Sequence, residues 1–178
     1  MYAIKAVVVT SLLALSIIGC ADAEPAEVDH AGDDPANVDQ AIIDATFRLN
    51  PVSTNFTASG SMTLKKGGVT LNCTANFTGG TDAAGAGKVT GASFSGGSIC
   101  NGLTATGLPW AIVPSSTTQV SVQNVAVNTL LGACGPSSLP AAFNNTNGSL
   151  TFNNAALTGG CSVSGTLTTA PRITVVAQ

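Results

Sequence analysis

Ten consecutive residues, from Val69 to Thr78, alternate between apolar and polar side chains. A period of two residues indicates a β-strand with one face buried and the other face in water. Cys73 belongs to the apolar set, between Leu71 and Ala75, so the buried face of this strand carries a cysteine. Any fold that accepts this strand must contain a sheet that is covered on one side and wet on the other.

The same alternation returns in weaker form along most of the chain after residue 45. We expect further strands at residues 47–49, 57–64, 88–94, 120–127, 149–152, 156–158, 162–168 and 173–176. The alternation slips at Asn124, which predicts a β-bulge there. No apolar stripe at helical spacing persists for three turns, and glycines and prolines punctuate the strands. The sequence therefore predicts an all-β fold, a single antiparallel β-sandwich or a barrel-like domain, over residues 46–178.

The N-terminus has the features of an export signal. Lys5 precedes an apolar run at residues 6–18, which is too short to span a bilayer. Residues 21–23, Ala-Asp-Ala, fit ordinary signal cleavage and give a signal peptide of residues 1–23. Residues 17–20 instead resemble a bacterial lipobox, which gives a signal peptide of residues 1–20 and makes Cys20 the lipidated first residue. The protein is therefore expected to be exported, either as an outer-membrane or cell-surface lipoprotein or as a secreted extracellular protein.

Charge is concentrated in residues 21–45. Eight of the nine acidic residues lie there, together with Pro25 and Pro35 and without any lysine or arginine. This composition predicts a disordered acidic linker that repels itself and stays extended. From residue 46 onward there are five basic residues and one acidic residue, Asp82, which gives this sparsely charged domain a formal charge of +4.

Four of the five cysteines remain once Cys20 is assigned to the signal or the anchor. An even number in an exported domain predicts two disulfides, for which three connectivities exist. The cysteines are separated by 27, 34 and 27 residues, and this symmetric spacing favours the pairs Cys73–Cys100 and Cys134–Cys161.

Few side chains of the domain are suited to catalysis. The only histidine, His30, lies in the acidic linker, and Asp82 is the only carboxylate of the domain. These facts exclude a Ser-His-Asp triad and paired catalytic carboxylates within the domain. No S-x-x-K motif links a serine to Lys65, Lys66 or Lys88. We expect no enzyme activity, no catalytic residues and no cofactor.

Binding chemistry is also limited. The four cysteines lack the close spacing of zinc ligands, and the five bases form no stripe, so neither a metal site nor a nucleic-acid partner is expected. Trp110 is the only tryptophan. We expect it to anchor the core, with a ligand contact at the surface as the alternative.

Several stretches together resemble the exported bacterial proteins called activators of alkane oxidation. They are residues 65–79, residues 91–96 with Cys100, residues 108–110, residues 134–136 and residues 160–171. The resemblance covers roughly residues 50–176, and the four cysteines with Pro109-Trp110 are its most specific part. It implies an extracellular, non-catalytic protein that helps cells grow on or emulsify hydrocarbons, with a role in biofilm or surface attachment. The acidic linker and the lipobox depart from it, because they point to tethering where simple secretion is expected.

Two functional hypotheses follow. The first is a non-enzymatic exported or cell-surface protein that aids contact with, emulsification of and uptake of hydrophobic substrates such as alkanes. The alternative is a structural biofilm-matrix or adhesion protein that self-associates through β-strands, since few charges protect the strand edges. The expected partners are a hydrophobic substrate or the extracellular matrix, further copies of the chain, and a membrane reached through a lipid on Cys20.

Overall fold

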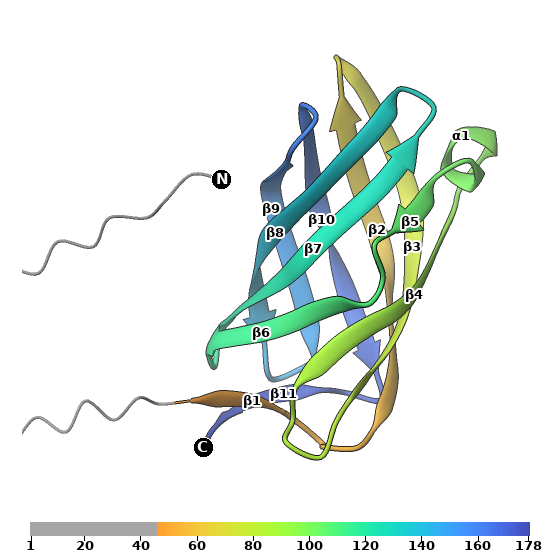
Figure 1. Ribbon diagram of the computed structural model, residues 1–178. Helices are drawn as coiled ribbons and strands as arrows, with labels where there is room; N and C mark the ends of the chain where they lie inside the picture. The colour runs from red at the N-terminus through yellow and green to blue at the C-terminus, as the bar shows by residue number, and fades with distance from the viewer. Residues whose placement is uncertain (1–45) are drawn as a thin grey trace, which may run out of the picture. The chain divides into compact units, whose positions relative to one another are not determined.

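The computed structural model describes residues 46–178, which form eleven strands and one four-residue helix (Figure 1). The elements are β1 (Phe47–Asn50), β2 (Asn55–Lys66), β3 (Val69–Thr81), β4 (Gly87–Ser95), α1 (Ser98–Asn101), β5 (Thr104–Thr106), β6 (Trp110–Ser116), β7 (Gln119–Thr129), β8 (Gly132–Asn144), β9 (Ser149–Leu157), β10 (Cys161–Ala170) and β11 (Thr174–Ala177). The predicted signal peptide, its cleavage sites, Cys20 and the acidic linker lie outside the described residues. Those assignments stay predictions.

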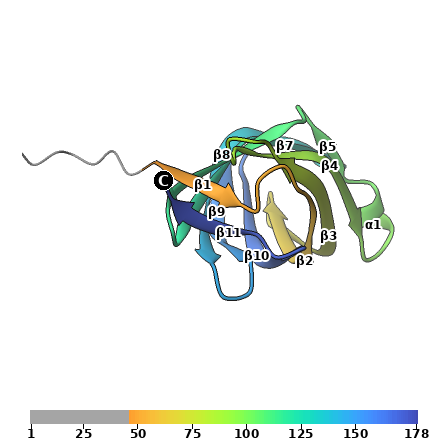
Figure 2. The same ribbon diagram turned by 90° about the horizontal axis from the view of Figure 1, so that it is seen from below.

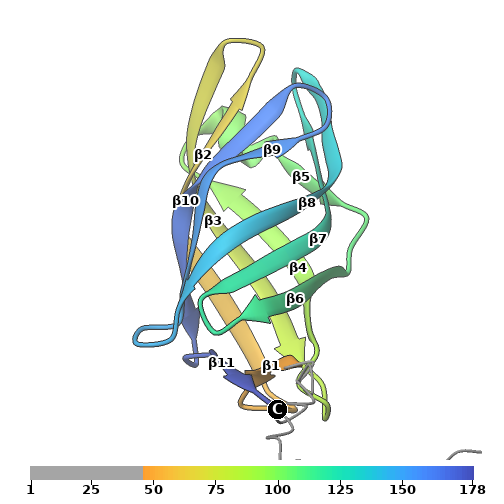
Figure 3. The same cartoon turned by 90° about the vertical axis from the view of Figure 1, so that its left-hand side faces the viewer.

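Eight strands close into an antiparallel barrel in the order β7-β6-β4-β3-β2-β10-β9-β8, and β8 pairs back with β7. The strands run at a slant around the barrel, as the view of β6, β7 and β8 in Figure 3 makes clear. The expected all-β fold is confirmed, and of its two forms the barrel is observed and the sandwich is not. A sandwich leaves strand edges open, whereas the β7–β8 and β4–β6 ladders close the sheet on itself.

The strand that dominates the sequence pattern behaves as predicted. In β3 the side chains of Cys73 and Ala75 are buried, and the alternate threonines and asparagines are exposed. The strand continues past the predicted end to Thr81 and pairs with β2 along its whole length. Gly67 and Gly68, at φ angles of 55° and 83°, form the two-residue turn between β2 and β3. Both turn positions require positive φ, which glycine adopts without steric cost.

Three strands escaped the sequence prediction. They are β5, β6 and β8, and prolines 114, 136 and 140 lie within the last two. Proline cannot donate to a sheet ladder, so prolines argue against a central strand. In β8 the ladder to β9 covers only Ala142–Asn144 and leaves both prolines outside it, whereas Pro140 lies opposite Ser121 in the ladder to β7. The predicted separate strand at residues 156–158 is wrong, since residues 156 and 157 complete β9.

The predicted bulge in β7 is confirmed. The pairing between β7 and β8 shifts between Val122 and Val125, and Asn124 between them has a φ of 60°. Asparagine is among the residues that tolerate this left-handed conformation best. The bulge lets both Val122 and Val125 face the interior, where each is buried.

Apolar side chains fill the barrel, and Trp110 is the largest of them. Trp110 is 1% exposed, its Nε1 donates a hydrogen bond to the carbonyl oxygen of Thr106 at 2.9 Å, and its ring meets Phe77 edge-on at 5.8 Å. It therefore lies in the core, and the alternative of a surface contact does not describe its position. A buried tryptophan needs a partner for its N–H, and Thr106 supplies one.

A separate two-stranded ribbon, β1 with β11, lies across one end of the barrel (Figure 2). Leu49 of β1 and Val175 of β11 are 2% and 1% exposed. A Cβ placed on Gly87 of β4 would lie 2.3 Å from Cδ1 of Leu49, so the ribbon packs closely on the barrel wall. The ribbon closes this end of the core.

Gly60 allows β2 and β10 to approach each other closely. A Cβ at this position would lie 2.0 Å from the carbonyl oxygen of Thr166, a backbone atom that cannot move unless β10 shifts. Replacement of Gly60 by alanine is expected to lower the free energy of unfolding by about 2–3 kcal/mol, measured by denaturant titration. Gly102→Ala is the matched control, because a Cβ there meets its nearest atom at 3.4 Å. Equal stability of the two variants would contradict the close approach.

Candidate functional site

Exposed apolar side chains gather at the barrel end opposite the β1–β11 ribbon. Among residues 46–178, five large hydrophobic residues are exposed, and four of them lie around one groove of about 250 Å³. We refer to these four, Val69, Ile99, Leu130 and Leu131, as the apolar rim. They come from three separate segments: β3, α1 and the turn between β7 and β8, which meet at the upper end of the barrel in Figure 1. Exposed hydrophobics that gather in one place are candidates for an interaction surface, whereas single exposed hydrophobics need no explanation.

The β7–β8 turn contributes the two most exposed members of the rim. Leu130 is 73% exposed and Leu131 is 52% exposed, although turns normally carry polar residues or glycine. Thr129 supplies the polar chemistry of the turn, since its Oγ1 accepts a hydrogen bond from the N–H of Leu131 and donates one to the carbonyl of Gly132. The turn is therefore held by a threonine while both leucines remain in solvent.

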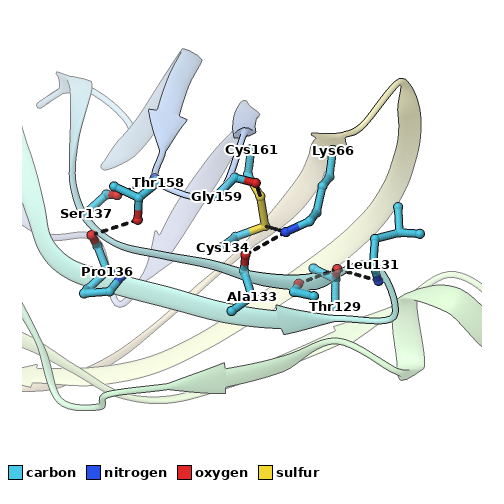
Figure 4. Close-up of a disulfide and its surroundings, with 11 residues drawn as sticks. Lys66, Thr129, Leu131, Ala133, Cys134, Pro136, Ser137, Thr158, Gly159 and Cys161 are labelled. Atoms are coloured by element: carbon cyan, nitrogen blue, oxygen red, sulfur yellow. Dashed lines mark hydrogen bonds between the residues drawn. A yellow bond between two sulfur atoms is a disulfide. The ribbon is translucent and has the colours of Figure 1, made fainter.

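Lys66 connects the two hairpins that flank the groove (Figure 4). Its Nζ donates a hydrogen bond of 2.6 Å to the carbonyl oxygen of Ala133, at the start of β8, and lies 4.0 Å from Sγ of Cys134. The side chain of Lys66 also lines the groove. Lysine can pack its methylenes on apolar surface while the ammonium stays at the edge. Lys66 therefore fixes the β2–β3 hairpin against the β7–β8 hairpin.

Both disulfides lie beside the apolar rim. Cys73 of β3 is bonded to Cys100, the neighbour of Ile99 in α1, and Cys134 of β8 is bonded to Cys161 of β10. These are the pairs that the cysteine spacing favours. The first bond attaches α1, with Ile99, to the barrel wall. The second attaches β8 to β10 three residues after Leu131 (Figure 4). Two disulfides therefore fix the segments that carry or adjoin the apolar rim.

A second hollow lies inside the barrel. It is a cavity of about 90 Å³ lined almost entirely by apolar side chains, among them Met62, Leu64, Trp110 and Leu139. Leu64 lines both this cavity and the groove at the rim. The interior hollow and the surface groove therefore share a wall.

Asp82, the acidic residue singled out in the sequence, has a structural role. Oδ1 of Asp82 accepts hydrogen bonds from the N–H groups of Ala84 and Ala86, both at 2.9 Å. The only acidic side chain among residues 46–178 therefore holds the β3–β4 loop, at the end of the barrel away from the rim. Residues 46–178 contain no cluster of three or more His, Cys, Asp or Glu side chains that could hold a metal. No helix within the described part of the chain is long and apolar enough to cross a membrane.

The sequence matches the family described as "Alkane oxidation protein activator PraA/PraB-like" over residues 1–177. The chain belongs to this family. Comparisons with the curated proteins and with the solved structures find no match. The family membership agrees with the resemblance drawn from the cysteines and from Pro109-Trp110. In this PraA/PraB-like protein, sequence reasoning did not single out the rim, although the pair Leu130-Leu131 before Gly132 was a visible signal of an apolar turn.

Proposed function

We propose that this PraA/PraB-like protein acts without catalysis, outside the cell or at its surface, by adsorbing through the apolar rim to hydrophobic material such as alkane droplets. Adsorption of this kind would aid contact with the hydrocarbon, its emulsification and its uptake. The observation that carries the proposal is the gathering of four of the five exposed large hydrophobics at one end of the barrel. The family description, which names activation of alkane oxidation, supports the same reading.

The energetics of the rim support adsorption. Removing apolar surface from water contributes about 25 cal/mol per Å², or roughly 1.5–3 kcal/mol for a leucine that is fully buried. Leu130 and Leu131 are largely exposed in the isolated protein, so most of this free energy is still available when they are buried on adsorption. The only acidic side chain of the domain, Asp82, lies in the β3–β4 loop at the other end, so no carboxylate at the rim has to be desolvated. The charges near the rim are the ammonium groups of Lys65 and Lys66 at the end of β2, and a lysine can keep its ammonium in water while its methylenes lie on apolar surface.

The surroundings of the polar groups support a non-catalytic, exported role. The domain lacks histidine, and its one carboxylate is occupied by two backbone N–H groups. All four cysteines of the domain are in disulfides, which leaves no thiol nucleophile among them. Disulfides persist in oxidising compartments, which fits export.

The test is adsorption to hexadecane droplets. The double variant Leu130→Ser/Leu131→Ser should reduce partitioning to droplets by about 30- to 150-fold, which corresponds to roughly 2–3 kcal/mol of lost apolar burial. Stability should change little, because both side chains are exposed in the isolated protein. Bound and free protein are separated by flotation and quantified.

Val113→Ser is the matched control, since Val113 is the one exposed large hydrophobic among the described residues that lies away from the rim, on β6. It should leave droplet partitioning unchanged. Equal loss in both variants would mean that general hydrophobicity decides adsorption, and unchanged partitioning of the leucine double variant would overturn the proposed role of the rim.

A second function, self-association in a biofilm matrix, is favoured by one feature of the barrel. The β4–β6 ladder covers only Gly87–Val89, so the backbone of β4 from Thr90 to Ser95 has no ladder partner on that side, although α1 and β5 lie next to β4. Unpaired strand edges promote association between chains. Sedimentation over a range of concentrations together with thioflavin fluorescence separates the two functions. A protein that stays monomeric and dye-negative excludes assembly through this edge.

A further inference from the structure

The interior cavity is dry by its chemistry. Its volume of about 90 Å³ exceeds the roughly 10–15 Å³ that one water requires. However, a buried water also needs two to four polar partners. The one polar side chain in the lining, Thr169, already has its partners, since its Oγ1 donates to the carbonyl of Gly148 at 2.9 Å and accepts from the N–H of Ile173 at 3.0 Å. Water entering the cavity would lose hydrogen bonds without replacement.

The lining follows the length of the barrel. On β2 alone, Phe56, Ala58, Met62 and Leu64 face the cavity at alternate positions. Eight residue steps along a strand span about 26 Å. Val163 and Leu167 continue the same lining on the neighbouring strand β10. A lining that is long and apolar, around a small total volume, suits a thin linear molecule better than a bulky one.

We infer that the barrel interior is a binding site for one short linear hydrocarbon, or for the end of a longer alkyl chain. The inference rests on the proposed function, because the rim would bring the hydrocarbon to the barrel. Eight-stranded barrels have interiors just wide enough to be filled by side chains or to hold one small ligand. The cavity, at about 90 Å³, is smaller than the roughly 150 Å³ engineered apolar cavity that binds benzene, so the ligand has to be short and thin. Met62, a flexible side chain in the lining, can adjust to the chain that enters.

Leu64 marks the end at which the ligand enters. It is the one residue that lines both the cavity and the groove of the apolar rim. The other end of the core is closed by Leu49 and Val175 of the β1–β11 ribbon. A hydrocarbon held at the rim therefore has its shortest path to the interior past Leu64.

The cavity itself accepts only the apolar part of a ligand. A fatty acid or an alcohol short enough to lie wholly inside would have to bury a carboxylate or hydroxyl where the lining offers no free hydrogen-bond partner, and unpaired polar groups are strongly disfavoured in apolar surroundings. The segment that occupies the cavity is thus an unfunctionalised alkyl chain.

Trp110 provides the reporter for a test, because it lines the cavity and is the only tryptophan of the chain. The full chain, purified with both disulfides formed, is titrated with 1-bromobutane, whose bromine quenches indole fluorescence on contact. We expect saturable quenching. Bromide ion and 3-bromopropanoate should give no saturable quenching, since Trp110 is 1% exposed and the cavity offers no partner for a carboxylate.

Ala58→Leu fills the cavity from β2 and should weaken 1-bromobutane binding at least tenfold. If that variant does not fold, Val122→Leu fills the cavity from β7 and serves the same test. The rim variant Leu130→Ser/Leu131→Ser should keep saturable quenching at equilibrium. Quenching that is linear in 1-bromobutane, or that is unchanged in a folded filling variant, would overturn the cavity site. Loss of droplet adsorption in the rim variant with quenching retained separates the two proposals. Retained adsorption by the wild type without saturable quenching would remove only the cavity site.

Discussion

Replacement of all four domain cysteines by alanine is expected to lower the free energy of unfolding by roughly 7 kcal/mol. Each disulfide joins residues 27 positions apart, and a loop of that length is worth about 3.5 kcal/mol in the chain-entropy model. Since single domains are stable by only about 5–15 kcal/mol, the cysteine-free domain should be largely or wholly unfolded at 37 °C. Circular dichroism during thermal and denaturant unfolding measures the loss.

Variants that lack one pair at a time separate stability from function. Removal of one disulfide should lower the free energy of unfolding by about half of that amount, in Cys73→Ala/Cys100→Ala as in Cys134→Ala/Cys161→Ala. Only the first releases α1, and with it Ile99, from the barrel wall. Under conditions where both variants are folded, the first should therefore adsorb to droplets less well than the second. If both adsorb like the wild type, the disulfides stabilise the fold without positioning the rim.

Trp110→Ala is expected to destabilise the barrel by about 4 kcal/mol. The side chain is almost fully buried, contacts Phe77 edge-on and hydrogen-bonds to Thr106, so truncation leaves a large cavity and an unpaired carbonyl. Denaturant unfolding followed by circular dichroism measures the change, because the variant has no tryptophan fluorescence.

Val113→Ala provides the control on the same strand. Val113 is 41% exposed, so its truncation should cost less than about 0.5 kcal/mol. Trp110→Phe should fall between the two, since it keeps an aromatic ring but loses the hydrogen bond to Thr106. A loss below 1 kcal/mol in Trp110→Ala would show that the core does not depend on this residue.

Local pattern was enough to predict most of the strands. The alternation of β3, the glycine turn at residues 67–68 and the slip at Asn124 are properties of neighbouring residues, and each has its counterpart in the structure. The choice between sandwich and barrel was beyond local pattern. Closure depends on ladders between residues far apart in sequence, such as Gly87–Val89 with Trp110–Ile112. Closure also depends on β8, and its two prolines argue against a strand in the sequence.

The candidate site was harder to predict for the same reason. Its four rim residues come from segments that the fold brings together, and Ile99 is next to Cys100, which is bonded to β3. The leucine pair in the β7–β8 turn was the one local signal. The cavity has no local signal at all, because its lining alternates with polar residues like that of any filled barrel.

The β1–β11 ribbon also determines how the molecule can be attached to a surface. Thr46, where the first 45 residues join the domain, and Gln178 at the C-terminus lie together at that ribbon, and the backbone N–H of Gln178 bonds to the carbonyl of Thr46. Both ends of the domain therefore leave the barrel on the side away from the apolar rim (Figure 1). A tether at either terminus therefore attaches to the end of the barrel opposite the apolar rim. Immobilisation through residue 178 should preserve adsorption, whereas immobilisation through residue 66, which lines the groove, should block it.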